Sequence, residues 1–180
     1  MEHELKTIST SGISEALSKA QLYRSLHEPE ESESICEDIL VADAENQAAL
    51  RLLGLSITDQ FTGDITDRYG EAENAFRRLT DPYAQHYYLG ILMERRAKAL
   101  MRAGRPAHLV VSLLEQAMLH FEAAETIRPT ANEESILRWN RCVRLLKKLP
   151  RSEAVDVSTT FAEDDTAPLE VLPRSGGARR

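Results

Sequence analysis

The sequence has few of the residues that interrupt helices or cross-link a chain. Its 180 residues include eight glycines, seven prolines and two cysteines, and only 6% are aromatic. Residues that favour strands do not alternate over any useful length, so the composition favours an all-α protein. Nothing requires a disulfide between Cys36 and Cys142, and we expect both to be buried, reduced packing residues.

The sequence also has no long hydrophobic run. No segment approaches the roughly 18 apolar residues of a membrane-spanning helix, and the N-terminal MEHELKTIST lacks the apolar region of a signal peptide. We therefore expect a soluble, cytoplasmic protein. Its formal net charge of −7 argues against a whole-surface nucleic-acid binder. We expect a protein or peptide partner rather than nucleic acid or a membrane.

Catalytic and metal-binding motifs are missing as well. None of the five histidines has another histidine three or four residues later, and HExxH, CxxC, GxxxxGK[ST] and GxSxG do not occur. The aspartates between 59 and 67 lack the spacing of a calcium loop. We interpret them as turn and capping residues, with Asp67 capping the helix that follows. We expect no enzyme, no catalytic or metal-binding residue and no cofactor.

What the sequence does contain is helical periodicity. Apolar residues recur at spacings of three and four in seven segments, which predicts helices over about 14–27, 30–42, 47–60, 68–79, 83–103, 106–127 and 131–148. Gly104 is expected just after a helix end, with Pro106 opening the next helix, and a capping box is expected at 130–133. The predicted domains are a flexible N-terminus over 1–12, a helical domain over 13–149 and a disordered tail over 150–180.

The sixth predicted helix carries the clearest packing pattern. Ala117, Phe121 and Ala124 share one helical face, and Pro129 ends the helix. Two small side chains let a neighbouring helix approach, and the ring between them fills the space that remains. The pattern predicts a close pair of helices.

A leucine–glycine pair occurs twice in the earlier helices, at an offset of 36 residues. The glycines are Gly54 and Gly90. Because a glycine inside a helix costs about 1 kcal/mol relative to alanine, we expect another helix to pass close to each. After the first pair, Ala72 and Phe76 repeat the small-then-large spacing.

Together these patterns resemble the tetratricopeptide repeat (TPR) family over residues 14–148. The resemblance implies a right-handed α-solenoid of about three TPR-like helical hairpins plus a C-terminal capping helix. Two spacings depart from the family: the step from Gly54 to Ala72 is 18 residues, and the step from Gly90 to Ala117 is 27. They predict a longer loop in the second unit and longer helices in the third. An unrelated helical bundle is the alternative.

The resemblance also implies a function and a site. In TPR proteins the first helix of each pair lines an inner groove that binds a peptide or partner helix, so this chain resembles a non-catalytic adaptor or scaffold. Carried over to this sequence, the partner-binding positions are Leu17, Gln21, Arg24, Arg51, Leu55, Thr58, Tyr87, Ile91 and Glu94. They lack the lysine and asparagine pattern of the family's chaperone-tail clamp, so that partner is not expected.

Two alternative functions stay open. One is a homo-oligomeric helical bundle that associates through the long helices within 83–127. The other is binding of an anionic surface by the basic helix 131–148. Basic residues also crowd 95–105. We interpret both basic groups as solvated faces paired with acidic residues of the sixth predicted helix, Glu115, Glu122 and Glu125.

Overall fold

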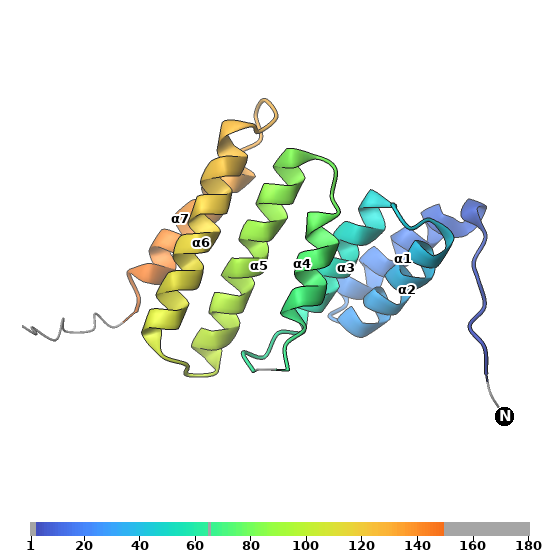
Figure 1. Cartoon of the computed structure of the whole chain (residues 1–180), viewed down its shortest axis with the longest axis horizontal. Helices are drawn as coiled ribbons and strands as arrows, with labels where there is room; N and C mark the ends of the chain where they lie inside the picture. Colours follow the sequence, from blue (N-terminus) through green and yellow to red (C-terminus); the bar gives the residue numbers. More distant parts are fainter. Residues whose placement is uncertain (1–2, 65, 150–180) are drawn as a thin grey trace, which may run out of the picture. The chain divides into compact units, whose positions relative to one another are not determined.

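A computed structural model places residues 3–64 and 66–149. Within these ranges all regular structure is helical (Figure 1). In chain order the elements are a 3₁₀ turn at Thr10–Gly12 and the helices α1 (Ile13–Ser25), α2 (Pro29–Ala42), α3 (Gln47–Asp59), α4 (Tyr69–Arg77), α5 (Pro82–Arg102), α6 (Ala107–Thr126) and α7 (Glu134–Leu146). The all-α prediction is therefore confirmed for these residues. The tail predicted over 150–180 lies outside them.

The helices pack in the order in which the chain forms them. Each helix contacts the next one along the chain, and Figure 1 shows α3, α4, α5 and α6 standing side by side. The odd-numbered helices also contact one another in succession: α1 touches α3, α3 touches α5, and α5 touches α7. One face of the described residues is consequently built from α1, α3, α5 and α7.

Two hairpins are held together by the same contact between a glycine and an aromatic ring. A Cβ atom added to Gly54 would lie 2.6 Å from Cζ of Phe76, and one added to Gly90 would lie 2.6 Å from Cε1 of Phe121. Both rings are fully buried. Any larger side chain would have to displace the ring, which explains glycine inside both helices. The predicted close helix approach is confirmed at Gly54 and Gly90.

The first hairpin uses smaller residues in its core. Ala20 and Cys36 are fully buried and pack with Leu52 of α3. Cys36 and Cys142 are both free and buried, and burial raises the pKa of each thiol to about 12. Both thiols therefore stay protonated at neutral pH, as expected of buried packing residues.

The loop before α4 differs from the prediction, because Asp67 does not cap the helix. Its carboxylate instead accepts hydrogen bonds from the backbone N–H groups of Thr62 (2.9 Å) and Gly63 (2.8 Å), and α4 begins at Tyr69 without a side-chain cap. Gly63 has a φ of +89°, and a Cβ there would come 2.5 Å from the carbonyl oxygen of Ala99. Asp67 thus closes a loop that packs tightly on α5.

The capping box predicted at 130–133 is also wrong. The turn places Ala131 in the left-handed region with a φ of 65°, so α7 begins only at Glu134. The Oδ1 atom of Asn132 accepts hydrogen bonds from the N–H of Glu134 (3.0 Å) and from the hydroxyl of Tyr83 (3.1 Å). Asn132 therefore starts α7 and ties it to α5.

Gly104 ends α5 as predicted, whereas Pro106 precedes α6 instead of opening it. The N–H of Gly104 donates to the carbonyl of Met101 (3.2 Å), and the N–H of Arg105 donates to that of Leu100 (3.0 Å). Gly104 has a φ of +65°. This arrangement is a Schellman motif, which satisfies the last carbonyls of a helix.

Candidate functional site

The common face of the odd-numbered helices carries a group of charged and polar side chains and one exposed leucine, and we call it the inner face. It comprises Gln21, Arg24, Arg51, Thr58, Asp59, Glu94, Arg95, Lys98, Arg102, Leu137, Arg138 and Arg141. Residues three or four apart on a helix lie on the same side of it. This spacing aligns Glu94, Lys98 and Arg102 along α5, and Leu137 and Arg141 along α7.

One carboxylate on the inner face links three helices. Asp59, at the end of α3, accepts from Arg24 of α1 (2.7 Å) and from Arg95 of α5 (2.6 Å). Arg95 also donates to the hydroxyl of Thr58 (2.6 Å) and to the carbonyl oxygen of Leu55 (3.0 Å). Burial lowers the pKa of Arg95, while Asp59 opposes that shift. The guanidinium stays charged because its ordinary pKa lies far above neutral pH.

A second carboxylate links α5 to α7. Glu94 is fully buried, and its oxygens lie 3.4 Å from Nζ of Lys98 and 3.4 Å from Nη1 of Arg138. Burial acts to lower the pKa of Arg138, but its interactions with Tyr87 and Glu94 outweigh burial and raise that pKa. A buried carboxylate is tolerated only when cations compensate for its lost hydration. The two cations supply that compensation.

The inner face is hollowed at three places. A recess of about 180 Å³ is lined by Thr58, Asp59, Arg95, Lys98 and Arg102. A second, of about 330 Å³, is lined by Tyr87, Glu134, Leu137, Arg138 and Arg141. A third, of about 390 Å³, is lined by Arg24, Ser25, His27, Pro29 and Asp59. All three are open depressions that contain arginine.

The structure places the predicted partner-binding residues at different depths. Gln21 and Arg51 are exposed, and Leu17 and Arg24 are half-buried. The other five predicted residues are buried: Leu55, Thr58, Tyr87, Ile91 and Glu94. Only part of the predicted set is therefore available to a partner. Of the buried residues, Thr58 and Glu94 take part in the polar contacts of the inner face, and Tyr87 lines one of its recesses.

The remaining inner-face residues were not among the predicted groove positions. Asp59 and Arg95 each directly follow a predicted position. Arg138 and Arg141 belong to α7, which was predicted to cap the array and, in one alternative function, to bind an anionic surface. The contact between Arg138 and Glu94 joins residues 44 positions apart. The sequence did contain one feature that could have indicated these residues, namely the opposite charges of Glu94, Arg95 and Lys98 on the last turns of α5.

The interpretation of the 95–105 basic group as partners of α6 is wrong. Among the described residues, its ion pairs run to Asp59, Glu94 and Asp64 and none runs to Glu115, Glu122 or Glu125. Arg96 stacks over the ring of Tyr69, 4.3 Å from its centroid. Arg102 donates to the carbonyl of Phe61 (3.2 Å) and Arg105 to that of Gly63 (3.3 Å). The group therefore secures the loop before α4 and part of the inner face.

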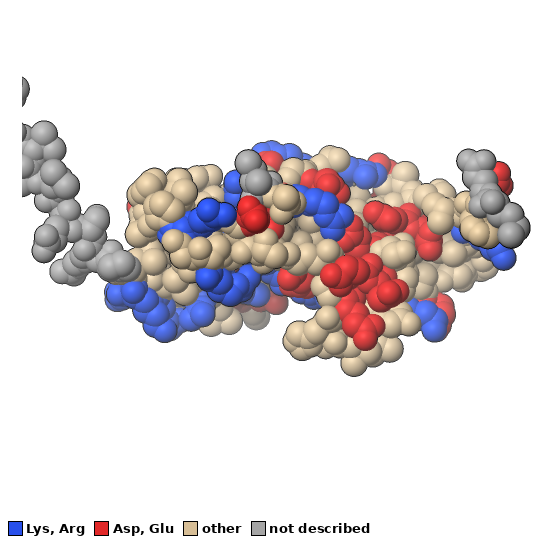
Figure 2. Space-filling view, turned by 90° about the horizontal axis from the view of Figure 1, so that it is seen from below, with Lys and Arg blue, Asp and Glu red and all other residues tan. Residues whose placement is uncertain are grey.

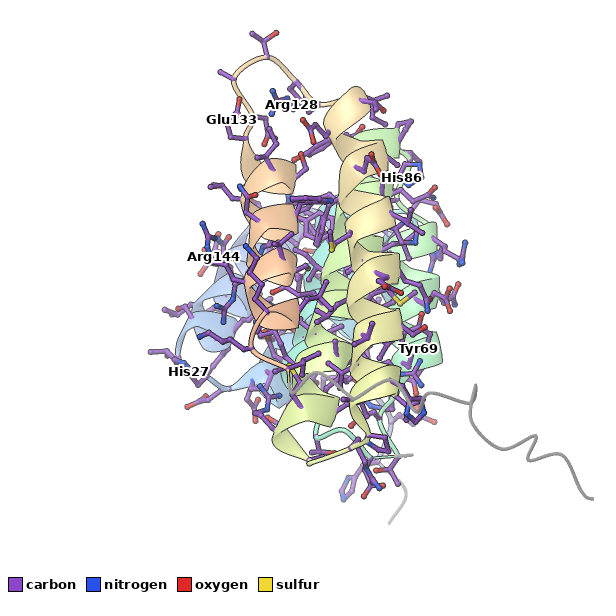
Figure 3. The ribbon with its side chains drawn as sticks, turned by 90° about the vertical axis from the view of Figure 1, so that its left-hand side faces the viewer. His27, Tyr69, His86, Arg128, Glu133 and Arg144 are labelled. Carbon is purple, nitrogen blue, oxygen red and sulfur yellow. The ribbon has the colours of Figure 1, made fainter. Side chains whose placement is uncertain are left out.

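Two histidines meet on the side of the molecule away from α7. Nδ1 of His86 on α5 lies 3.5 Å from Nδ1 of His120 on α6. Burial and the neighbouring His86 lower the pKa of His120. Figure 3 shows His86 and Tyr69 on the opposite side of the helices from Arg144 and His27. Within the described residues, no group of three or more His, Cys, Asp or Glu side chains could hold a metal ion.

A larger cavity of about 500 Å³ lies away from the inner face, between α5, α6 and the loop before α4. Leucines on α5 and α6 form its apolar part, and the loop before α4 forms one wall: it is lined by Gly63, Asp64, Asp67, Arg96, Leu100, Arg105, Pro106, Leu109, Ser112, Leu113 and Gln116. Its polar groups make hydrogen bonds or ion pairs within the chain, as with Asp67 and Arg105. Asp67 and Arg105 hold the loop, while Gln116 donates to Ser112 within α6.

Charge is distributed unevenly along the chain. Residues 28–45 contain eight acidic residues and no lysine or arginine, whereas 82–149 contain eleven basic and six acidic residues. Figure 2 shows the largest acidic group over the α1–α4 part and a large basic group over the α5–α7 part. Although the total charge is negative, the protein has a basic region, and this region includes most of the inner face.

No protein-family model, curated protein or solved structure matches the chain. Within the described residues, no helix is long and apolar enough to cross a membrane. The function is accordingly argued from the inner face and its geometry.

Proposed function

We propose that this protein is a TPR-like α-solenoid that serves as a non-catalytic interaction module, with a peptide or partner helix bound along the inner face. One observation carries the proposal: three successive odd-numbered helices are joined on that face by the ion pairs of Asp59 with Arg24 and Arg95. The repeated contact of Phe76 with Gly54 and of Phe121 with Gly90 supports the TPR-like part.

A preorganised face favours binding because ordering side chains and loops on association costs about 0.5–1.5 kcal/mol per immobilised side chain. On the inner face this ordering is already present in the free protein, since Arg95 makes three contacts with α3. Glu94 likewise holds Lys98 and Arg138 in place. A partner therefore meets a surface whose charged groups are largely positioned.

The proposal is tested by cross-linked capture of a partner from an extract of the native host. The bait carries Arg51→Glu with Leu137→Asp, because Arg51 is exposed and Leu137 is 64% exposed, so neither change disturbs the core. Loss of an interfacial contact worth more than 1 kcal/mol lowers affinity at least about fivefold. We expect that loss for this bait. The control bait is Leu119→Asp on α6, where a leucine is 66% exposed on the outer side.

Equal capture by the wild-type and inner-face baits would refute the proposal, provided circular dichroism shows unchanged helicity. The buried Tyr87 is left intact, because its removal would open a cavity and confuse loss of binding with loss of stability.

A second candidate function is self-association through the long α5–α6 hairpin. It is favoured by two exposed leucines on α6, Leu109 (44% exposed) and Leu119 (66% exposed), which a second copy of the chain would cover. Light scattering over a range of concentrations tests it. A dimer that the Leu119→Asp variant abolishes supports this function, and a monomer at every concentration rejects it.

A further inference from the structure

We infer that the inner face recognises an acidic peptide segment, one that presents several carboxylates and an aliphatic residue. The inference rests on the proposed function, because it assumes that this face is where the partner binds. It goes further by assigning the partner's chemistry, which follows from how the charges of the inner face are arranged.

On the inner face, cations outnumber the carboxylates with which they pair. Asp59 is paired with two arginines, Arg24 and Arg95. Glu94 is paired with Lys98 and Arg138. Each cluster therefore retains one net positive charge after its internal pairing. An arginine has five N–H donors and a lysine three, so donors remain for a partner's carboxylate.

The charged side chains of the Glu94 cluster differ in how deeply they are buried. The side chain of Glu94 is 0% exposed, whereas those of Lys98 and Arg138 are 33% and 37% exposed. The negative partner thus lies below the surface and the cations lie above it. At the Glu94 cluster an approaching segment therefore meets positive charge first, whereas in the other cluster the Asp59 side chain is 29% exposed, and those of Arg24 and Arg95 are 26% and 19% exposed.

Two of the three recesses on the inner face, those along α5 and α7, contain a further exposed arginine. Arg102 lines the recess with Lys98, and its hydrogen bond to Phe61 uses only one of its donors. Arg141 lines the recess with Leu137, whose side chain is 64% exposed. The second recess therefore offers a cation beside an apolar contact, which suits an acidic residue next to an aliphatic one.

The two recesses set a length for the segment. Tyr87 and Arg102 are fifteen residues apart on one helix, which at a rise of 1.5 Å per residue is about 22 Å. An extended chain covers about 3.3 Å per residue, so about seven residues reach both recesses. A short linear segment is sufficient.

Nucleic acid fits the inner face less well than an acidic peptide. The carboxylates of Asp59 and Glu134 line the recesses and would repel a continuous phosphate backbone. Single-stranded nucleic acid also needs aromatic rings on which bases stack. The aromatic ring in the recess, Tyr87, is only 6% exposed. A peptide can place its carboxylates between these groups.

Fluorescence anisotropy with a synthetic peptide tests the inference. The probe is a labelled (Glu-Ser-Leu-Glu)₃ peptide, compared with its (Gln-Ser-Leu-Gln)₃ counterpart and with a labelled oligo-dT, all at low salt, where charge pairs are weakly screened. We expect the acidic peptide to bind at least about tenfold more tightly than its glutamine counterpart. The Arg102→Gln/Arg141→Gln variant should lose at least about fivefold in affinity, as expected for removal of rim and recess charges.

The matched control is Lys19→Gln/Arg77→Gln, which removes two positive charges from side chains that are 60% and 63% exposed elsewhere. Equal loss in both variants would mean nonspecific attraction and overturn the inference, as would equal binding of the glutamine peptide or tighter binding of oligo-dT. A different result refutes the proposed function: the wild-type bait and the bait with inner-face substitutions capture the native partner equally. If capture depends on that face but the acidic peptide does not bind, only the assignment of an acidic partner falls.

Discussion

The α3–α4 and α5–α6 hairpins share one packing contact but differ in the lengths of their helices. In both, a glycine of the first helix receives a phenylalanine ring of the second: Gly54 receives Phe76, and Gly90 receives Phe121. Yet α3 and α4 have 13 and 9 residues, while α5 and α6 have 21 and 20. The contact that joins two helices is therefore local, and it does not determine how far they continue.

The additional length of α5 has two uses. On the inner face its last turns present Glu94, Arg95 and Lys98, which join α5 to α3 and α7. On another side they receive the loop before α4, whose Gly63 packs against Ala99. The longer hairpin thus adds a charged surface to the repeated core contact. This difference separates the residues that join the two helices of a hairpin from the charged residues that join α5 to α3 and α7.

The largest expected effect comes from breaking the shared contact in both hairpins. Gly54→Ala and Gly90→Ala should each lower the free energy of unfolding by about 1–3 kcal/mol, because the added methyl group overpacks a buried ring. If the two contacts are equivalent, the two losses will be similar. Urea denaturation followed by circular dichroism measures both.

The control is a double-mutant cycle that trims the ring. Gly90→Ala with Phe121→Leu should be less destabilised than the sum of the single changes, with a coupling of about 0.5–3 kcal/mol. Strict additivity would show that the methyl group acts through something other than Phe121.

The glycine–phenylalanine contact is among the features that could be predicted from the sequence. Helix positions and the Gly54 and Gly90 packing follow from spacings of three and four residues, which are local properties of the chain. The ends of α7 and the loop before α4 did not follow from capping motifs. Asp67 instead closes a loop whose Gly63 packs against Ala99 of α5, and Asn132 also accepts a hydrogen bond from Tyr83, 49 residues away. Both positions therefore depend on contacts with α5 that no local motif specifies.

The site was less predictable than the fold for the same reason. Arg24 was named as a site residue, but its partner Asp59 lies 35 residues away on another helix. Glu94 was expected to face a partner, yet it is buried because Arg138 of α7 covers it. A sequence pattern gives the face of one helix, whereas the depth of a side chain depends on the neighbouring helices.

A smaller effect is expected where α1 and α5 end in the same motif with different residues. Gly104 follows α5 with a φ of +65°, and His27 follows α1 with a φ of 65°. A side chain in the left-handed region costs about 1–2 kcal/mol. His27→Gly should therefore stabilise the protein by about 1 kcal/mol, and Gly104→Ala should destabilise it by a similar amount. A Cβ at Gly104 would meet no atom within 4 Å, so that change isolates the backbone effect.

Thermal or urea unfolding of both variants measures these changes. Because the two substitutions lie far apart in the chain and share no contact, the protein that carries both provides a further check, and in it the two effects should nearly cancel. Destabilisation by His27→Gly would show that the imidazole makes a contact worth more than the backbone strain.

The smallest effect expected is a difference in pH response between the α5–α6 hairpin and the contact of α2 with the start of α4. Burial and His86 lower the pKa of His120 from its ordinary 6.5, so the folded state disfavours the extra proton. Stability from this site is complete above about pH 6.5 and declines as the pH falls below it. For Glu33, the hydrogen bond from Arg68 lowers the pKa from its ordinary 4.5. Its contribution, which joins α2 to the start of α4, is present above about pH 4.5 and declines only below that.

Acidification should therefore weaken the α5–α6 hairpin before the α2–α4 contact. The measurement is the free energy of unfolding between about pH 7.5 and 5, the range in which histidine titrates. His120→Gln should flatten that part of the profile, whereas His108→Gln, at an exposed position of the same helix, should leave it unchanged. If both variants keep the wild-type slope, the loss of stability in this range arises outside the histidine pair. The α5–α6 hairpin and the α2–α4 contact would then not differ in pH response as the pKa of His120 predicts.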